Sequence, residues 1–189
     1  MRSWCARAPP NHVLLQLDFR NAFNLLLRAG MLQAIKDLCP WFLAYALACY
    51  GSPVKLVSSD GIVLPSCEGV QQGDPCGPLF FAVAIAMLTR WLGTVPEVWS
   101  VWFLDDGHLA GPRAVLHDLL PVLEAKAKTL GLSLIREKCA VYLPVGEPLP
   151  SDFLPGIPRV CPDACLPASV GLPGRGPYGE FGLGPREGP

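Results

Sequence analysis

Residues 98–110 read VWSVWFLDDGHLA, and this stretch guides the interpretation of the rest of the chain. Residues 98–104 form an apolar, strand-prone run, residues 105–107 (Asp-Asp-Gly) form a turn sequence, and residues 108–110 suit a short return strand. The stretch therefore predicts a β-hairpin that carries two adjacent carboxylates at its tip. Because Asp and Gly are common in any tight turn, this pair alone fits an ordinary hairpin as well as a catalytic site.

A third carboxylate, Asp18, stands directly after the apolar run of residues 13–17. That run fits a strand buried on both faces. An aspartate after a strand commonly caps the next helix, which is the plainer interpretation of Asp18 taken alone. Two or three carboxylates, however, can hold the pair of divalent metals that nucleotidyl transfer requires. Asp18 and the hairpin aspartates are far apart in sequence, so only the fold can bring them together.

Residues 69–78, GVQQGDPCGP, lie between these two motifs and form a loop rich in glycine and proline. Gly73 lets the backbone approach a ligand closely, and the prolines stiffen the loop. As an isolated segment, the loop is equally well explained as two successive turns. It leads into an apolar helix expected over residues 79–92, with Pro78 at its start and Gly93 at its end.

In this order the three motifs resemble the palm of a reverse transcriptase, an RNA-directed DNA polymerase, and most of all those of non-LTR retrotransposons. The resemblance covers about residues 12–143. It implies that Asp18, Asp105 and Asp106 are catalytic and bind two Mg²⁺ ions, which Mn²⁺ can replace, together with the backbone carbonyl of Phe19. The implied reaction adds dNTPs to a DNA primer on an RNA template.

The resemblance also implies which residues bind the nucleotide. Phe23, an aromatic five residues after Asp18, resembles the steric gate that excludes a ribose 2′ hydroxyl; outside the family context a core phenylalanine explains it equally well. Gln72 and Gly73 are expected to contact the nucleotide or its paired template base. Cys76 stands where the family usually has leucine.

Residues 131–139, GLSLIREKC, resemble the fourth motif of the family. The resemblance places Lys138 near the triphosphate, where it would neutralise or protonate the leaving pyrophosphate. Outside the family context, an exposed lysine beside Glu137 is the plainer interpretation. Phe103 replaces the tyrosine that usually precedes the paired aspartates, which removes a hydroxyl near the primer terminus.

The order of elements predicts an α+β fold, a polymerase palm in which an antiparallel sheet carries helices on one face. Residues 144–189 are rich in proline and glycine and are expected to be a disordered tail. Besides the elements above, we expect a helix over 25–38 capped by Asn24, a helix over 40–50, a hairpin of 54–57 with 62–64, a helix over 112–130 that Pro121 kinks or restarts, and strands at 132–135 and 139–143.

Composition narrows the classes of protein. Hydrophobic residues make up 51% of the chain and charged residues 16%, but the longest apolar runs, 41–50 and 79–88, are too short to cross a membrane. With no signal peptide visible, we expect an intracellular protein, nuclear or cytoplasmic, without a membrane partner. The eight cysteines form no CxxC pair, which favours reduced thiols over structural zinc.

The net charge of −1 provides no overall basic field for nucleic acid. Little sequence precedes residue 12, and no thumb follows residue 143, so the missing basic grip is expected on fingers and thumb segments of a longer polyprotein. The alternative is a catalytically inactive retroelement remnant, or a fragment that binds other chains through an exposed apolar face. A viral RNA-dependent RNA polymerase shares the Asp-Asp turn, but Phe23 and the Gln-Gly-Asp-Pro loop favour a reverse transcriptase.

Overall fold

A computed structural model describes residues 8–71, 73–144 and 153–160. The central feature is a five-stranded sheet in which all neighbouring strands are antiparallel except the last pair, β6 and β7. In spatial order its strands are β4 (Trp99–Phe103), β5 (Asp106–Pro112), β1 (His12–Leu17), β6 (Ala140–Tyr142) and β7 (Arg159–Val160).

Strand β1 is the centre of this sheet, because it pairs with β5 on one side and with β6 on the other. Val13, Leu15 and Leu17 have no exposed surface, and Leu14, on the opposite face, is only 4% exposed. A strand paired on both sides and largely buried is expected to be mostly apolar, and only His12 and Gln16 of β1 are polar and half-buried. The prediction of a buried strand before Asp18 is confirmed.

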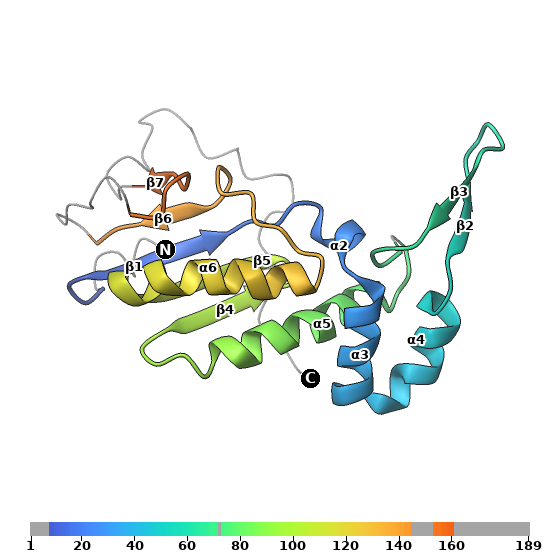
Figure 1. Ribbon diagram of the computed structural model, residues 1–189, viewed down its shortest axis with the longest axis horizontal. Coiled ribbons are helices and arrows are strands. Elements are labelled where there is room, and N and C mark those ends of the chain that lie inside the picture. Colours follow the sequence, from blue (N-terminus) through green and yellow to red (C-terminus); the bar gives the residue numbers. More distant parts are fainter. Residues whose placement is uncertain (1–7, 72, 145–152, 161–189) are drawn as a thin grey trace, which may run out of the picture.

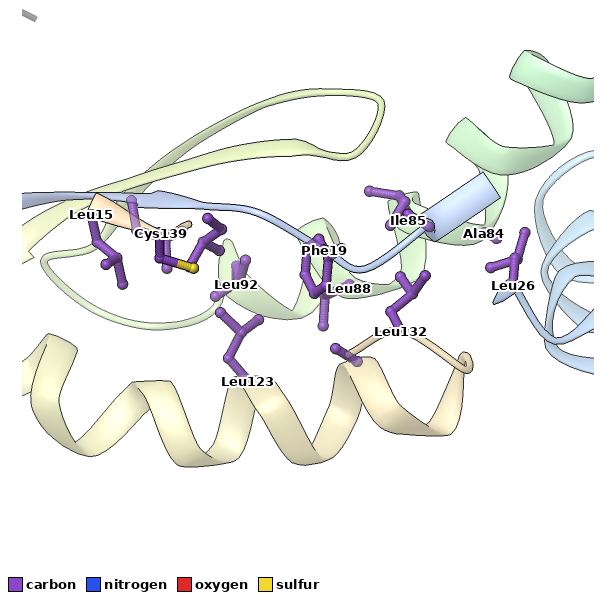
Figure 2. Close-up of a cluster of buried hydrophobic side chains, with 14 of the residues drawn as sticks. Leu15, Phe19, Leu26, Ala84, Ile85, Leu88, Leu92, Leu123, Leu132 and Cys139 are labelled. Atoms are coloured by element: carbon purple, nitrogen blue, oxygen red, sulfur yellow. The ribbon is translucent and has the colours of Figure 1, made fainter. Parts of the chain in front are cut away.

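Two long helices, α5 (Gly77–Leu92) and α6 (Arg113–Thr129), cover one face of the sheet (Figure 1). In the core between them, Leu88 and Leu92 of α5 and Leu123 of α6 lie near Leu15 of β1 (Figure 2). The other face is open, and β4 exposes every second side chain there: Trp99, Val101 and Phe103. The predicted α+β class, with helices on one face of an antiparallel sheet, is confirmed.

A second group of elements extends from one end of α5 (Figure 1). It contains α3 (Arg28–Leu38), a short 3₁₀ turn (Pro40–Phe42), α4 (Leu43–Tyr50) and the hairpin of β2 (Val54–Val57) with β3 (Val63–Ser66). Phe80 of α5 is its anchor, because the rings of Phe42 and Tyr50 both meet it edge-on, at 6.2 and 5.9 Å between centroids.

The helix predicted over residues 25–38 is wrong at its start. The structure has a single turn, α2 (Ala22–Leu25), and a separate α3, so Asn24 lies inside α2 and caps nothing. Leu26 leaves the helical conformation because its carbonyl oxygen accepts a bond from Gly69 N–H, while Leu27 N–H donates to the Leu130 carbonyl. Bonds to distant segments thus interrupt a helix that local periodicity would continue.

The C-terminal prediction also needs correction. Residues 132–135 form no strand but only an isolated bridge between Leu134 and Phe19. Within the tail expected from residue 144, residues 153–160 are folded: Phe153, Leu154 and Ile157 are buried, and β7 pairs with β6. The prediction failed because it used the proline and glycine content of the whole 144–189 segment, in which this short apolar cluster does not stand out. The rest of that prediction, for residues 145–152 and 161–189, lies outside the described residues.

Helix α6 runs through Pro121 as a single helix, so the fresh start considered from the sequence is wrong. None of the helices in the described part of the chain has the length and hydropathy to span a bilayer.

Candidate active site

The paired strands β1 and β5 bring the predicted carboxylates to one end of the sheet. Leu17 is the last residue of β1 to pair, opposite Gly107, so the next position along both strands sets Asp18 opposite Asp106. A Cβ on Gly107 would meet the Trp102 ring at 2.7 Å, on the helix-covered face. Because side chains alternate along a strand, Asp18 and Asp106 belong to the open face.

The tip of the β4–β5 hairpin differs in detail from the sequence prediction. The turn residues are Leu104 and Asp105, and Asp106 already belongs to β5, where it pairs with Phe103. Leu104 has a φ of 54°, a left-handed conformation that costs a side-chain-bearing residue about 1–2 kcal/mol. Its side chain packs against the core, which offsets part of that cost and holds the half-buried Asp105 at the tip.

The backbone at Asp18 is fixed by the segment that follows α6. Its carbonyl oxygen accepts a bond from Ile135 N–H at 2.9 Å, and its N–H lies 3.4 Å from the Cys139 sulfur. Cys139 is 1% exposed, and burial raises the pKa of its thiol, so the sulfur beneath Asp18 is uncharged at neutral pH. The predicted fourth motif therefore lies directly against the first.

The carbonyl of Phe19 points toward the side of β1 on which Asp106 lies. Phe19 forms an antiparallel bridge with Leu134, and the flanking residues make the hydrogen bonds, through the Asp18 carbonyl and Arg20 N–H. In such a non-hydrogen-bonded pair, the N–H and C=O of the bridging residue point away from the partner strand. Since Leu134 lies on the β6 side of β1, the Phe19 carbonyl is directed to the β5 side, where Asp106 lies.

These oxygen atoms suit Mg²⁺, a hard cation that is held by one or two carboxylates together with water and substrate phosphates. No hydrogen bond or ion pair between described residues engages the side chains of Asp18, Asp105 or Asp106. Equally, no three metal-ligating side chains in the described ranges already form a closed cluster. The arrangement fits an open site that substrate completes, and the assignment of these three residues and Phe19 as ligands stays a prediction.

Phe23 lies beside the glycine-rich loop. Its carbonyl oxygen accepts a bond from Val70 N–H at 2.9 Å, and Gly69 N–H donates to the Leu26 carbonyl at 2.8 Å. Its ring stacks on Phe81 of α5, with centroids 4.3 Å apart and planes 10° from parallel. The first and second motifs, which are separated by α3, α4 and the β2–β3 hairpin, therefore meet at the edge of the sheet.

The structure says less about the other residues that were predicted to bind the nucleotide. Gly73 is exposed at a φ of 92°, with nothing within 4 Å of where a Cβ would stand, so a ligand has access to its backbone. Lys138 is exposed and lies next to Cys139, in the segment that holds Asp18. Gln72 lies outside the described residues. An open pocket of about 700 Å³ adjoins this loop, bounded in part by Asn24, Leu64 and Gln71.

Sequence reasoning missed two buried polar side chains behind the loop. Arg28, 6% exposed, and Tyr50, 2% exposed, both hydrogen-bond to the segment of residues 66–74. An arginine near a helix start and a tyrosine at the end of an apolar helix carry no sequence signal for this role. Only the packing of α3 and α4 shows it.

Comparison with known proteins establishes the class. The model of a family described as "Reverse transcriptase (RNA-dependent DNA polymerase)" matches residues 1–161, and the chain belongs to this family. The resemblance inferred from the motifs is confirmed.

Individual relatives cover the chain in part. It is 28% identical, over 146 residues and 71% of its length, to the retrotransposable element SLACS 132 kDa protein of Trypanosoma brucei gambiense. Its fold is similar to telomerase from Candida albicans (TM-score 0.60, 13% identity, 80% of this chain) and from Candida tropicalis (TM-score 0.55, 10% identity, 69% of this chain). The chain spans 12% of the SLACS protein and 31% and 30% of those telomerase chains.

Proposed function

We propose that this chain carries the palm of a non-LTR-type reverse transcriptase, which adds dNTPs to a DNA primer on an RNA template. The observation that carries the proposal is the register of β1 with β5, which sets Asp18 opposite Asp106 and beside the turn residue Asp105. The retrotransposon relative and the Candida albicans telomerase, whose structure contains a fragment of telomeric RNA, support an RNA template.

The chain's own residues divide the work. Asp18, Asp105 and Asp106 would bind two Mg²⁺ or Mn²⁺ ions, which when bound activate the primer 3′ hydroxyl and neutralise the leaving pyrophosphate. Phe23, held by its stack on Phe81, would lie under the sugar and exclude a 2′ hydroxyl. Orientation of primer and nucleotide supplies much of the rate of such a transfer.

Residues around the triphosphate complete the proposed site. Gln72 and Gly73 would contact the nucleotide or its template base, and Lys138 would neutralise the pyrophosphate. The exposed backbone of Gly73 and the attachment of the 133–139 segment to Asp18 support these roles. The net charge of −1 favours a polyprotein whose other segments, including fingers and thumb, grip the nucleic acid.

A second candidate is a non-catalytic retroelement remnant that binds other chains. Exposed apolar side chains on the open face, such as Trp99 at 57% and Phe103 at 74% exposure, favour it.

Primer extension distinguishes the two candidates. The purified chain, with a primed RNA template and Mg²⁺ or Mn²⁺, should extend the primer, and Asp105→Asn should abolish extension because a metal ligand is lost. Asp118→Asn is the matched control, since Asp118 is exposed on α6 away from the site. Extension that survives Asp105→Asn would refute the site, and a wild-type chain that extends nothing even within its longer polyprotein would favour the non-catalytic candidate.

A further inference from the structure

Arg28, the first residue of α3, is buried, and no carboxylate among the described residues pairs with it. Its guanidinium donates instead to oxygen atoms of the segment that ends β3 and begins the glycine-rich loop. The bonds run from Nη1 to the Ser66 carbonyl at 2.7 Å, from Nη2 to Ser66 Oγ at 2.9 Å and to the Glu68 carbonyl at 3.1 Å, and from Nε to the Gly69 carbonyl at 3.0 Å. One side chain thus holds three backbone carbonyls and one hydroxyl of residues 66–69.

Tyr50, the last residue of α4, fixes the other end of the same loop. Its hydroxyl donates to Asp74 Oδ2 and accepts a bond from Gln71 N–H at 3.1 Å. Asp74 Oδ1 in turn accepts a bond from Cys76 N–H at 2.8 Å. Both buried side chains belong to one unit, because the Arg28 guanidinium carbon lies 5.2 Å from the centre of the Tyr50 ring.

The contacts of Tyr50 lie on both sides of Gly73, and those of Arg28 lie just before them in the loop. Arg28 holds the backbone at residues 66–69, and Tyr50 holds it at Gln71 and Asp74. Between Gln71 and Asp74, Gly73 has no packing partner at its Cβ position. The loop is therefore held at its ends and left open at the point where a ligand would contact it.

We propose that Arg28 and Tyr50 are positioning residues that hold residues 69–71 and 73–74 in the conformation that binds the incoming nucleotide. That the loop binds a nucleotide rests on the proposed function. That the two residues anchor the loop rests on the hydrogen bonds described above. Neither residue touches the carboxylates of the site.

The two anchors carry this role because of their chemistry. Only a guanidinium offers a planar fork with five donors, so lysine at position 28 cannot reach all four acceptors. Loss of the Tyr50 hydroxyl leaves Gln71 N–H and one Asp74 oxygen without their partner in a partly buried place. Because the loop holds the nucleotide equally before and during reaction, its loosening should raise KM for dNTP with little change in kcat.

Tyr50→Phe tests the proposal, because it removes one oxygen atom and keeps the ring against Phe80 and Arg28. Tyr45→Phe is the matched control, since Tyr45 is on the same helix, also lies against Phe80, and is 46% exposed. Hydrogen exchange of the full chain should show amides of residues 69–76 exchanging about tenfold faster in Tyr50→Phe and unchanged in Tyr45→Phe. In primer extension, KM for dNTP should rise about tenfold in Tyr50→Phe, with kcat within about twofold.

Arg28→Lys is the second variant, and its faster exchange should begin earlier, at residues 66–69. Exchange that is unchanged in both variants, or that rises equally throughout the chain, would overturn the proposal. A fall in kcat at unchanged KM would overturn it as well. If no primer is extended by the chain, alone or within its longer polyprotein, while the exchange pattern appears as described, the proposed function fails and the anchoring of the loop stands.

Discussion

Gly69 offers a sharp test of the junction between Phe23 and the glycine-rich loop. Its φ is 68°, and a Cβ built on it would lie 2.5 Å from the Asn24 carbonyl oxygen and 2.6 Å from the Asn24 carbonyl carbon. Backbone atoms cannot be displaced as a flexible side chain can. Gly69→Ala must therefore move the loop away from α2, and with it the bonds from Gly69 to Leu26 and from Val70 to Phe23.

The magnitude follows from comparison with Gly61→Ala. Gly61 has a similar φ of 77°, but nothing lies within 4 Å of its Cβ position. Both substitutions impose about 1–2 kcal/mol of left-handed strain and share the same gain from a stiffer unfolded chain. Gly69→Ala alone also loses two backbone hydrogen bonds at about 1 kcal/mol each. With that gain subtracted, we expect a net loss of about 1 kcal/mol for Gly61→Ala and about 3 kcal/mol for Gly69→Ala.

Urea unfolding of the two variants and the wild type measures this difference directly. The midpoint should fall further for Gly69→Ala than for Gly61→Ala, with the slope m unchanged if the native state keeps its compactness. Equal losses of unfolding free energy in both variants would refute the close approach of the loop to α2.

Three further predictions concern single side chains. Phe23→Val should let ribonucleotides compete at least about tenfold better against dNTPs in primer extension, because the ring that would block a 2′ hydroxyl is removed; unchanged selectivity would count against the gate. The raised pKa of the buried Cys139 thiol should make it react with iodoacetamide at least about tenfold more slowly at pH 8 than the exposed Cys67, as peptide mass spectrometry can follow. Burial and the bond to Asp74 raise the pKa of Tyr50 from 10.0 to about 12, so folded Tyr50 keeps its proton where the unfolded residue loses it. The free energy of unfolding should therefore fall between pH 10 and 12, and less steeply in Tyr50→Phe; parallel profiles would contradict this.

The elements of the sheet could be predicted because their signals are local. The apolar run before Asp18 and the apolar helix after Pro78 each contain enough buried surface to specify their own secondary structure. The hairpin of β2 with β3 was likewise predicted from its Asp-Gly turn. Which strand lies beside which came only from the family resemblance.

The errors arise where distant segments compete with local preference. The break at Leu26 is set by bonds to Gly69 and Leu130, residues that no helical window contains. The folded segment 153–160 is held partly by Arg136, which donates to both Glu124 oxygens, at 2.7 and 2.8 Å, and to the Pro155 carbonyl at 3.1 Å. The bond to Glu124 also raises the pKa of this guanidinium.

The candidate site, like the fold, was predicted from the sequence only in part. The carboxylates were proposed from the order of the three motifs and the family resemblance, because an aspartate after a strand or in a turn is by itself equally typical of a cap or a hairpin. Their mutual approach follows from the register of β1 with β5, which no local pattern states. The anchors Arg28 and Tyr50 were missed because their partners are mostly backbone groups, and backbone partners leave no trace in a sequence.

The central claim is that Asp18 and the Asp105–Asp106 pair bind divalent metal together, and iron-directed cleavage tests it most directly. Fe²⁺ in place of Mg²⁺, with ascorbate and peroxide, generates hydroxyl radicals that cut the chain near the bound ion, whether or not the protein extends primers. The account predicts cuts near residues 18 and 105 in the same sample, suppressed by excess Mg²⁺ and lost in Asp105→Asn but not in Asp118→Asn. Cuts at only one of the two segments, or cuts that survive Asp105→Asn, would contradict a shared site.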